Sequence, residues 1–131
     1  MTSRLFTIVF SASAALAPAA PLTWDSNGAT TGQTNGGGSW FGSGLWWNGT
    51  ANQDWVSDSD AIFGGTNTNG GIVTLPGPTS VGSITFNTFT GTYTIGTAGQ
   101  ALAISGGINK TSGAAAVSLT ASPITLGGAQ T

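Results

Sequence analysis

The stretch that decides the fold is residues 73–126, which read VTLPGPTSVGSITFNTFTGTYTIGTAGQALAISGGINKTSGAAAVSLTASPITL. Within it, apolar residues stand two apart in short runs that are bounded by Gly, Pro, Ser, Thr or Asn. Alternation with a period of two predicts strands with one buried face. The expected inward pairs are Val73/Leu75, Ile84/Phe86, Tyr93/Ile95, Leu102/Ile104, Val117/Leu119 and Ile124/Leu126.

The spacing of these pairs indicates a repeat. Leu102 and Ile104 recur 22 residues later as Ile124 and Leu126. Two further correspondences are expected: Tyr93 and Ile95 with Ala115 and Val117 at the same shift, and Ile84 and Phe86 with Leu102 and Ile104 at a shift of 18. Self-similarity at about 20 residues is typical of a solenoid, in which strands of successive coils stack. The alternative is a β-sandwich with evenly spaced strands.

The composition excludes several classes of function. Only 5% of the 131 residues are charged, and the chain has no His, no Cys and no Glu. Binding a nucleic-acid backbone requires several cations, and Arg4 and Lys110 are the only ones, so we expect no nucleic-acid partner. Without cysteines no disulfide stabilises the fold. A hydrophobic fraction of 39%, with five Trp, is nevertheless enough to build a core.

Residues 1–19 are typical of a secretory signal peptide. Arg4 supplies the positive charge, residues 5–16 are apolar or small, and small residues precede a cleavage site before Ala20. The alternative is an uncleaved N-terminal anchor. The remaining chain has no hydrophobic run long enough to span a bilayer. We therefore expect a secreted or cell-surface protein with no membrane span in its mature part.

The mature chain divides into two parts. Residues 20–70 contain all five Trp and are expected to form a cap and the first coil, because large aromatic side chains can cover the open end of a solenoid. Residues 27–38 lack periodicity and are expected to form an irregular loop, whereas residues 61–63 are expected to form the first strand. Residues 71–131 are expected to form coils that continue beyond the last residue.

The candidate catalytic residues are few. Ser-His and Cys-His pairs cannot be assembled, and the usual zinc ligands are missing. Asp54, Asp58 and Asp60 remain as a carboxylate cluster for glycoside hydrolysis, or, for Asp58 and Asp60, as part of a calcium loop. The favoured interpretation is solvated turn residues. We therefore expect no catalytic residue, no metal site and no cofactor.

The tryptophans offer a second candidate site. Exposed indole rings can stack on sugars, and the candidate carbohydrate contacts are Trp40, Trp46, Trp47 and Trp55. Adjacent residues on a strand point in opposite directions, so at most one of Trp46 and Trp47 can face a given partner. The favoured alternative is that these rings form the core of the cap.

Several motifs resemble one bacterial family. The sequence is similar to the start of large surface proteins that carry autotransporter-associated β-strand repeats, in these segments: Thr23-Trp24-Asp25, Trp46-Trp47-Asn48, Trp55, and residues 60–65, 81–87 and 126–131. The run VGSITFN at residues 81–87 is the most specific. The resemblance implies a right-handed parallel β-helix in a passenger exposed at the cell surface. It implies no catalytic residues, since that family shares none.

The first functional hypothesis is an exported, non-catalytic structural or adhesive β-helix segment at the bacterial cell surface. The second is a carbohydrate-binding module that uses the Trp cluster, with polysaccharide or cell-surface material as the partner. The third is a fragment of a β-helix enzyme that acts on polysaccharides. Because no strand is expected to cover Ile124 and Leu126, edge-to-edge self-association through this end is also expected.

Overall fold

The computed structural model describes residues 19–29 and 32–127, which form an all-β structure. No helix occurs among these residues. The predicted signal peptide falls almost entirely on residues 1–18, which lie outside the described residues. The strands are β1 (Leu22–Trp24), β2 (Gly38–Ser39), β3 (Trp46–Trp47), β4 (Asn52–Gln53), β5 (Ala61–Phe63), β6 (Ile72–Thr74), β7 (Thr79–Val81), β8 (Ile84–Phe86), β9 (Thr92–Ile95), β10 (Leu102–Ile104), β11 (Ile108–Lys110), β12 (Ala116–Leu119) and β13 (Ile124–Leu126).

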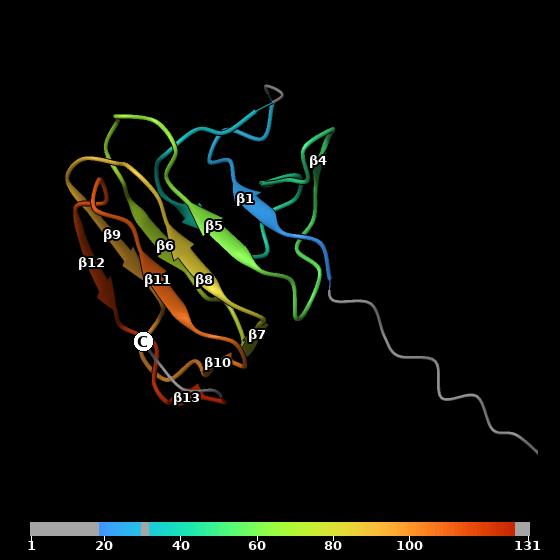
Figure 1. The fold of residues 1–131 in the computed structure, drawn as a ribbon. Coiled ribbons are helices and arrows are strands. Elements are labelled where there is room, and N and C mark those ends of the chain that lie inside the picture. The colour runs from blue at the N-terminus through green and yellow to red at the C-terminus, as the bar shows by residue number, and fades with distance from the viewer. Residues whose placement is uncertain (1–18, 30–31, 128–131) are drawn as a thin grey trace, which may run out of the picture.

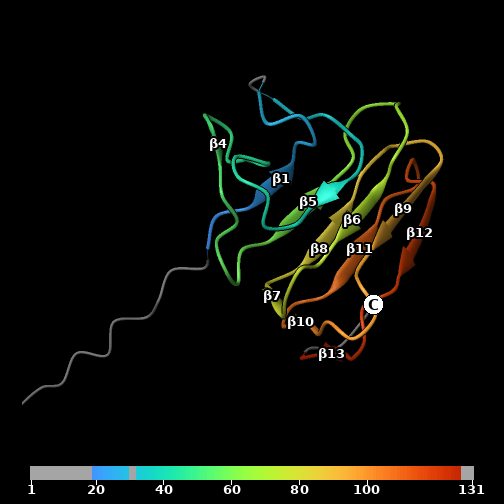
Figure 2. The ribbon, with the colours of Figure 1, turned by 180° about the vertical axis from the view of Figure 1, so that it is seen from behind.

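The strands form three sheets, which are seen from two sides in Figures 1 and 2. The six-stranded sheet has the order β11-β8-β5-β1-β3-β4, the four-stranded sheet β12-β9-β6-β2, and the three-stranded sheet β13-β10-β7. All pairings are parallel except those of β3 with β1 and with β4. The sheets are therefore mostly parallel.

From β5 onward the chain visits the three sheets in a fixed order. It passes through the six-, four- and three-stranded sheets in turn, and does so three times, ending with β13. Paired residues are 22 positions apart for Ile72 with Thr94 and 24 apart for Tyr93 with Val117. Each round of three strands therefore takes 22–24 residues.

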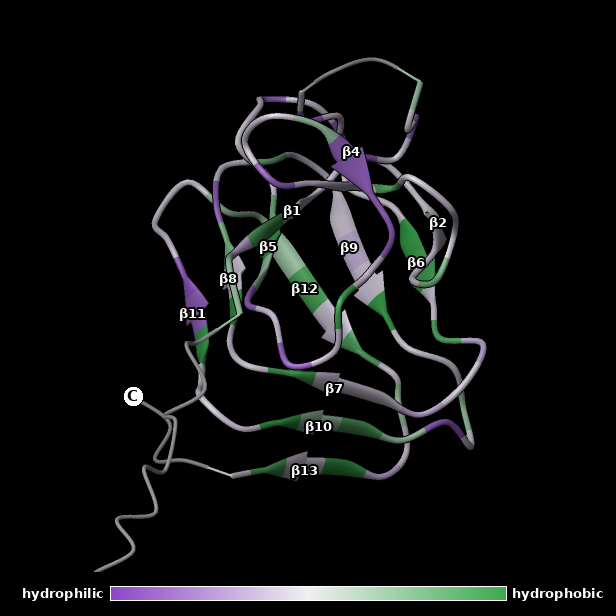
Figure 3. Cartoon of the chain, turned by 90° about the vertical axis from the view of Figure 1, so that its right-hand side faces the viewer, coloured by the Kyte–Doolittle hydropathy of each residue, from purple (hydrophilic) through white to green (hydrophobic). Residues whose placement is uncertain are grey.

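The three sheets face one core, and Figure 3 shows them around it. The strands of each sheet contribute to this single cluster, for example Phe86, Ile95 and Leu102. The alternation predicted from sequence is visible in β5, β8 and β10, whose first and third residues are buried while the middle one is more exposed.

The predicted inward pairs are largely confirmed. The first four pairs, from Val73/Leu75 to Leu102/Ile104, are buried, and Val117/Leu119 is partly buried against the core. Ile124 and Leu126 are 38% and 46% exposed, because β13 is the terminal strand of its sheet among the described residues. The 22-residue correspondence of Leu102 with Ile124 is also confirmed.

Two of the predicted correspondences are wrong. Tyr93 pairs with Val117, not Ala115, and Ile84 pairs with Ala61 and Ile108, not Leu102. The predicted shift of 18 residues matched β8 of the six-stranded sheet with β10 of the three-stranded sheet, two strands of the same round. This error has a physical cause: strands on every sheet carry the same inward apolar pair, so a strand resembles its neighbour along the chain as closely as its partner one round away.

Some strands were missed because they lack this pair. β7 has the inward residues Thr79 and Val81, and β11 carries Asn109 and Lys110. The N-terminal part also contains strands before residues 61–63, namely β1 to β4. In the predicted loop 27–38, the described residues are irregular until β2 begins at Gly38.

Gly64 illustrates how tightly the rounds pack. It follows β5 with a φ of 82°, and a Cβ atom placed on it would lie 2.7 Å from the Asn87 carbonyl oxygen of the next round. Only glycine adopts this backbone conformation without cost and admits so close an approach.

The described residues contain no helix that is long and apolar enough to cross a membrane.

Candidate functional site

The N-terminal end of the core is an aromatic cluster, here called the Trp cluster, formed by Trp24, Trp40, Trp46, Trp55 and Phe63. Trp46 lies at its centre, with ring centroids 5.2 Å from Trp24, 4.9 Å from Trp40 and 4.6 Å from Trp55. Phe63 then stacks on Phe86 of the next round at 5.5 Å. Such contacts add about 0.5–1.5 kcal/mol per pair beyond area burial.

Strand pairing brings these rings together. β1 and β3 are antiparallel with Trp24 opposite Trp46, so both indoles point inward from adjacent strands. Two indole N–H groups find backbone acceptors, since Trp24 Nε1 donates to the Gly36 carbonyl and Trp46 Nε1 to the Trp40 carbonyl, at 2.9 and 2.8 Å. The Nε1 atoms of Trp40 and Trp55 are buried and have no hydrogen-bond partner among the described residues.

The four candidate carbohydrate contacts do not form one surface. Trp40 and Trp46 have no exposed surface, so neither ring can stack on a sugar while the Trp cluster is intact. Trp55 is partly exposed but packs against the core. Trp47 alone of the four lies outside the core cluster and is partly exposed. The carbohydrate hypothesis therefore rests mainly on Trp47.

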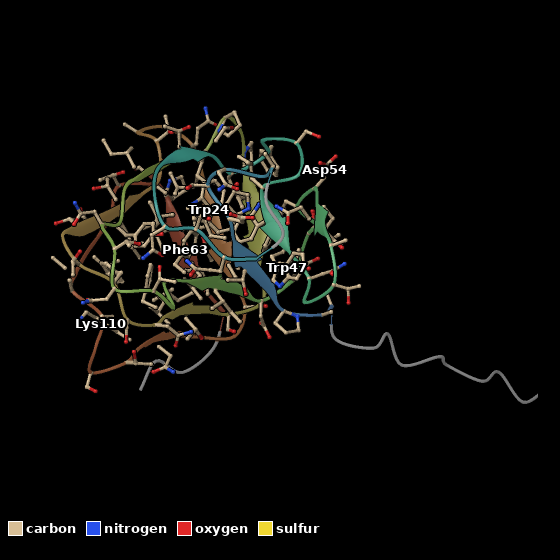
Figure 4. All side chains as sticks on the ribbon, turned by 90° about the horizontal axis from the view of Figure 1, so that it is seen from above. Trp24, Trp47, Asp54, Phe63 and Lys110 are labelled. Atoms are coloured by element: carbon tan, nitrogen blue, oxygen red, sulfur yellow. The ribbon has the colours of Figure 1, made fainter. Side chains whose placement is uncertain are left out.

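Trp47 occupies the outer face of the six-stranded sheet. It pairs with Thr23 of β1 and with Asn52 of β4, which places it between two polar residues on that face. Figure 4 shows Trp24 and Phe63 among the inner side chains, with Trp47 displaced toward the side that carries Asp54. The prediction that Trp46 and Trp47 point in opposite directions is confirmed by their different burial.

A buried carboxylate lies beside this face. Asp25 follows β1 and has no exposed surface. Asn52 Nδ2 donates to its Oδ2 at 2.8 Å and also to the Gly44 carbonyl at 2.9 Å. The other carboxylate oxygen of Asp25, Oδ1, and the amide oxygen of Asn52 are buried and have no hydrogen-bond partner among the described residues. Asp25 belongs to the motif Thr23-Trp24-Asp25, but its burial was not predicted, because a lone Asp after a strand carries no local signal of burial.

The three predicted carboxylates have separate environments. Asp54 is exposed and accepts hydrogen bonds from Ser43 Oγ and the Gly44 amide. Asp58 is an exposed turn residue with a φ of 65°. Asp60 is partly buried and accepts bonds from the amide and the hydroxyl of Ser83, at 2.7 and 2.8 Å. Asp60 therefore links two rounds, and only Asp54 and Asp58 match the predicted solvated turn residues.

An internal polar network also escaped the sequence analysis. Asn35 is almost fully buried, and its Nδ2 donates to the Thr66 and Thr68 carbonyls. Its Oδ1 accepts bonds from Gln33 Nε2 and from the Tyr93 hydroxyl, at 2.6 and 3.1 Å. Burial raises the pKa of Tyr93 to about 12, opposed by the weaker effect of the Gly36 amide, which donates to the hydroxyl.

Two of the surface pockets formed by the described residues lie at opposite parts of the fold. One of about 350 Å³ lies at the N-terminal end and is lined in part by Leu22, Val56, Asn48, Thr50 and Gln53. The other, of about 170 Å³, lies along the outside of the three-stranded sheet, over Ser80, Ala103 and Thr125. Both offer hydroxyls and aliphatic groups. The first also offers the side-chain amides of Asn48 and Gln53, and the second the carboxylate of Asp58.

The described side chains include hydroxyl, amide and carboxylate groups, which can hydrogen-bond to neutral polar ligands. No two carboxylates among these residues accept a printed hydrogen bond from the same donor: Asp25 accepts from Asn52, Asp54 from Ser43 and Gly44, and Asp60 from Ser83. The described residues also contain no group of three or more His, Cys, Asp or Glu side chains that could hold a metal ion. No family model, no curated protein and no solved structure matches this chain.

Proposed function

We propose that this chain is an exported, non-catalytic structural or adhesive module, built as a right-handed parallel β-helix and displayed at the bacterial cell surface. The observation that carries the proposal is the return of the chain to the same three sheets every 22–24 residues around one core, as in the pairs Thr79 with Leu102 and Leu102 with Ile124. Stacked parallel rounds are the defining property of a β-helix.

Two physical arguments support the right-handedness of the proposed β-helix and the role of the Trp cluster as its cap. Crossovers between parallel strands are right-handed in about 98% of cases, because of the twist of the strands. The Trp cluster lies under the first rounds and meets them through Phe63 and Phe86, which suits it for the role of an N-terminal cap.

The surface chemistry favours a structural role over catalysis. The outward residues of the three-stranded sheet are Ser80, Ala103 and Thr125, which are small and uncharged. With no His, Cys or Glu in the sequence, the described outer faces present mainly hydroxyls and amides. Such a surface stays hydrated without charge and can contact neutral cell-surface material over an extended area.

Export is tested by expressing the full chain in a bacterium and determining the N-terminus of the protein outside the cytoplasm. We expect cleavage before Ala20. Val9→Arg interrupts the apolar run and should leave the protein inside with its N-terminus intact, whereas Ser3→Arg, which only adds positive charge near Arg4, should be exported normally. Retention of the unchanged chain in the cytoplasm would refute export.

The second candidate function is carbohydrate binding through Trp47, and it is favoured by the partial exposure of that ring between Thr23 and Asn52. The test is electrophoresis in gels that contain neutral polysaccharides. The structural proposal expects unchanged mobility. Retardation that disappears in Trp47→Ala, but persists in Phe41→Ala, an exposed aromatic residue outside this strand pair, would establish the binding module instead.

A further inference from the structure

The larger of the two pockets lies at the end of the molecule that carries β1 and β4 (Figure 1). Its volume of about 350 Å³ is at the lower end of the range that is typical of pockets for small molecules. Four of its lining residues carry aliphatic side chains, and four carry hydroxyls or amides: Ala19, Ala20, Leu22 and Val56, and Asn48, Thr50, Gln53 and Ser59. We call it the N-terminal pocket.

Ser59 places a hydroxyl where the sheet otherwise buries apolar side chains. It continues the alternation of β5, whose inward residues are Ala61 and Phe63. Ser59 is 1% exposed, and its hydroxyl makes no hydrogen bond to another of the described residues. Its backbone is fixed on both sides, since its amide donates to the Val56 carbonyl and its carbonyl accepts from the Gly82 amide. Polar groups with so little exposure are normally hydrogen-bonded, so a free hydroxyl in the wall of a pocket indicates a ligand.

Two side-chain amides in the wall of the N-terminal pocket are held in place and still have hydrogens to donate. Asn48 Oδ1 accepts from the backbone amides of Thr50 and Ala51, both at 2.9 Å. Asn48 Nδ2 donates to Gln53 Oε1 at 2.7 Å, and Gln53 Nε2 makes only a long contact of 3.4 Å with the Asp54 carbonyl. A side-chain amide carries two N–H hydrogens, so each of the two can donate at least one more bond to a ligand.

The rest of the wall is apolar, and none of the eight lining side chains is charged. Val56 is 49% exposed and is one of the large apolar side chains that the core leaves uncovered among the described residues. An ionic group in this pocket would lose water without gaining a side chain of opposite charge, which is costly. The N-terminal pocket therefore suits a neutral ligand that has both hydroxyls and C–H groups.

We propose that the N-terminal pocket binds a single neutral sugar residue at the end of a cell-surface glycan. A sugar ring carries hydroxyls around its rim and C–H groups on its faces, which match the amides and Ser59 on one hand and Val56 on the other. The inference rests on the adhesive part of the proposed function and assigns the contact to a site that Trp47 does not line. The four polar lining residues all follow residue 20, so cleavage before Ala20 leaves them in place.

The test is NMR titration of the isotope-labelled full chain with the uncharged methyl glycosides of glucose, galactose, mannose and N-acetylglucosamine. We expect at least one of them to shift the side-chain amide signals of Asn48 and Gln53 in a saturable way. Glucuronic acid, a charged sugar, and N-acetylglycinamide, a neutral peptide probe, should leave these signals unchanged. No saturable shift with any glycoside, or equal shifts with either control probe, would overturn the proposal. Shifts confined to the indole of Trp47 would also overturn it and would favour the second candidate function.

Variants locate the site. Ser59→Ala should raise the dissociation constant of the glycoside that binds best about two- to tenfold, the loss expected for one hydrogen bond. Gln53→Leu should weaken binding similarly, at a position that is not fully buried. Ser80→Ala, at an exposed serine of the smaller pocket, should leave the constant unchanged, and the spectrum of each variant shows whether it is folded. Equal affinity in all three variants and the unchanged chain would contradict the proposal, whereas export and the stacking of rounds are tested by other measurements and would stand.

Discussion

At the scale of single residues, buried hydrogen bonds connect the irregular N-terminal loop to the rounds. Asn35 binds two carbonyls beyond β5 and the hydroxyl of Tyr93 in β9. Each bond of this kind contributes about 0.5–1.5 kcal/mol, and a buried group left without its partner costs more. No pattern of apolar residues predicts such bonds, because they join side chains to carbonyls that are more than 30 positions away.

Tyr93 should make stability depend on alkaline pH. Its pKa is about 12 in the folded chain because of burial, against about 10 when unfolded. The folded state therefore retains the phenolic proton longer, and the free energy of unfolding should fall as pH rises from 10 to 12. Since the chain has one tyrosine, the ultraviolet absorbance of tyrosinate follows this group directly. Tyr93→Phe should lack this part of the pH dependence, and an absorbance midpoint near 10 in the folded protein would contradict the prediction.

Two carboxylates provide a matched comparison of burial. Asp60 and Asp54 each accept bonds from one amide and one serine hydroxyl, but Asp60 is partly buried and Asp54 is exposed. Asp60→Ala should lower the free energy of unfolding by about 1–3 kcal/mol, because the Ser83 amide loses its acceptor away from water. Asp54→Ala should change it by about 0.5 kcal/mol or less. Denaturant unfolding measures both, and equal losses would argue against Asp60 as a link between rounds.

At the scale of strands, the burial of the inward pair depends on a following round. Ile104 of β10 lies between β7 and β13, whereas Leu126 of β13 has a neighbour on one side only. Ile104→Ala should therefore lower the free energy of unfolding by about 2–5 kcal/mol. Leu126→Ala should cost clearly less when measured at low protein concentration, where any association is absent. A larger loss for Leu126 would contradict the stacking order.

Whether a strand can be predicted from the sequence also depends on its inward pair of apolar residues. Alternation correctly located β6, β8, β9, β10, β12 and β13. Each carries or adjoins an alternating apolar pair, which packs in or against the core in all of them except β13, where it is exposed. It missed β7 and β11, whose residues include Thr79, Asn109 and Lys110 and which pair mainly through their backbones. Likewise, the burial of Trp46 and the partial exposure of Trp47 follow from the antiparallel β1–β3 register, which no local pattern encodes.

At the scale of the whole molecule, the two ends differ. The N-terminal end is closed by the Trp cluster and the β3–β4 pair, whereas at the other end β11, β12 and β13 are the terminal strands of their sheets among the described residues. In a structure of stacked rounds each round contacts only its neighbours, so stability is approximately a sum of rounds and junctions. The interior next to the Trp cluster should then be the most stable part, and the last round, β11 to β13, the least stable.

Amide hydrogen exchange tests this account most directly, because it reports the free energy of opening strand by strand. At low protein concentration we expect slow exchange in β5, β8 and β9, intermediate exchange in β10 and fast exchange in β11, β12 and β13. Uniform protection from β5 to β13 would contradict the account of stacked rounds.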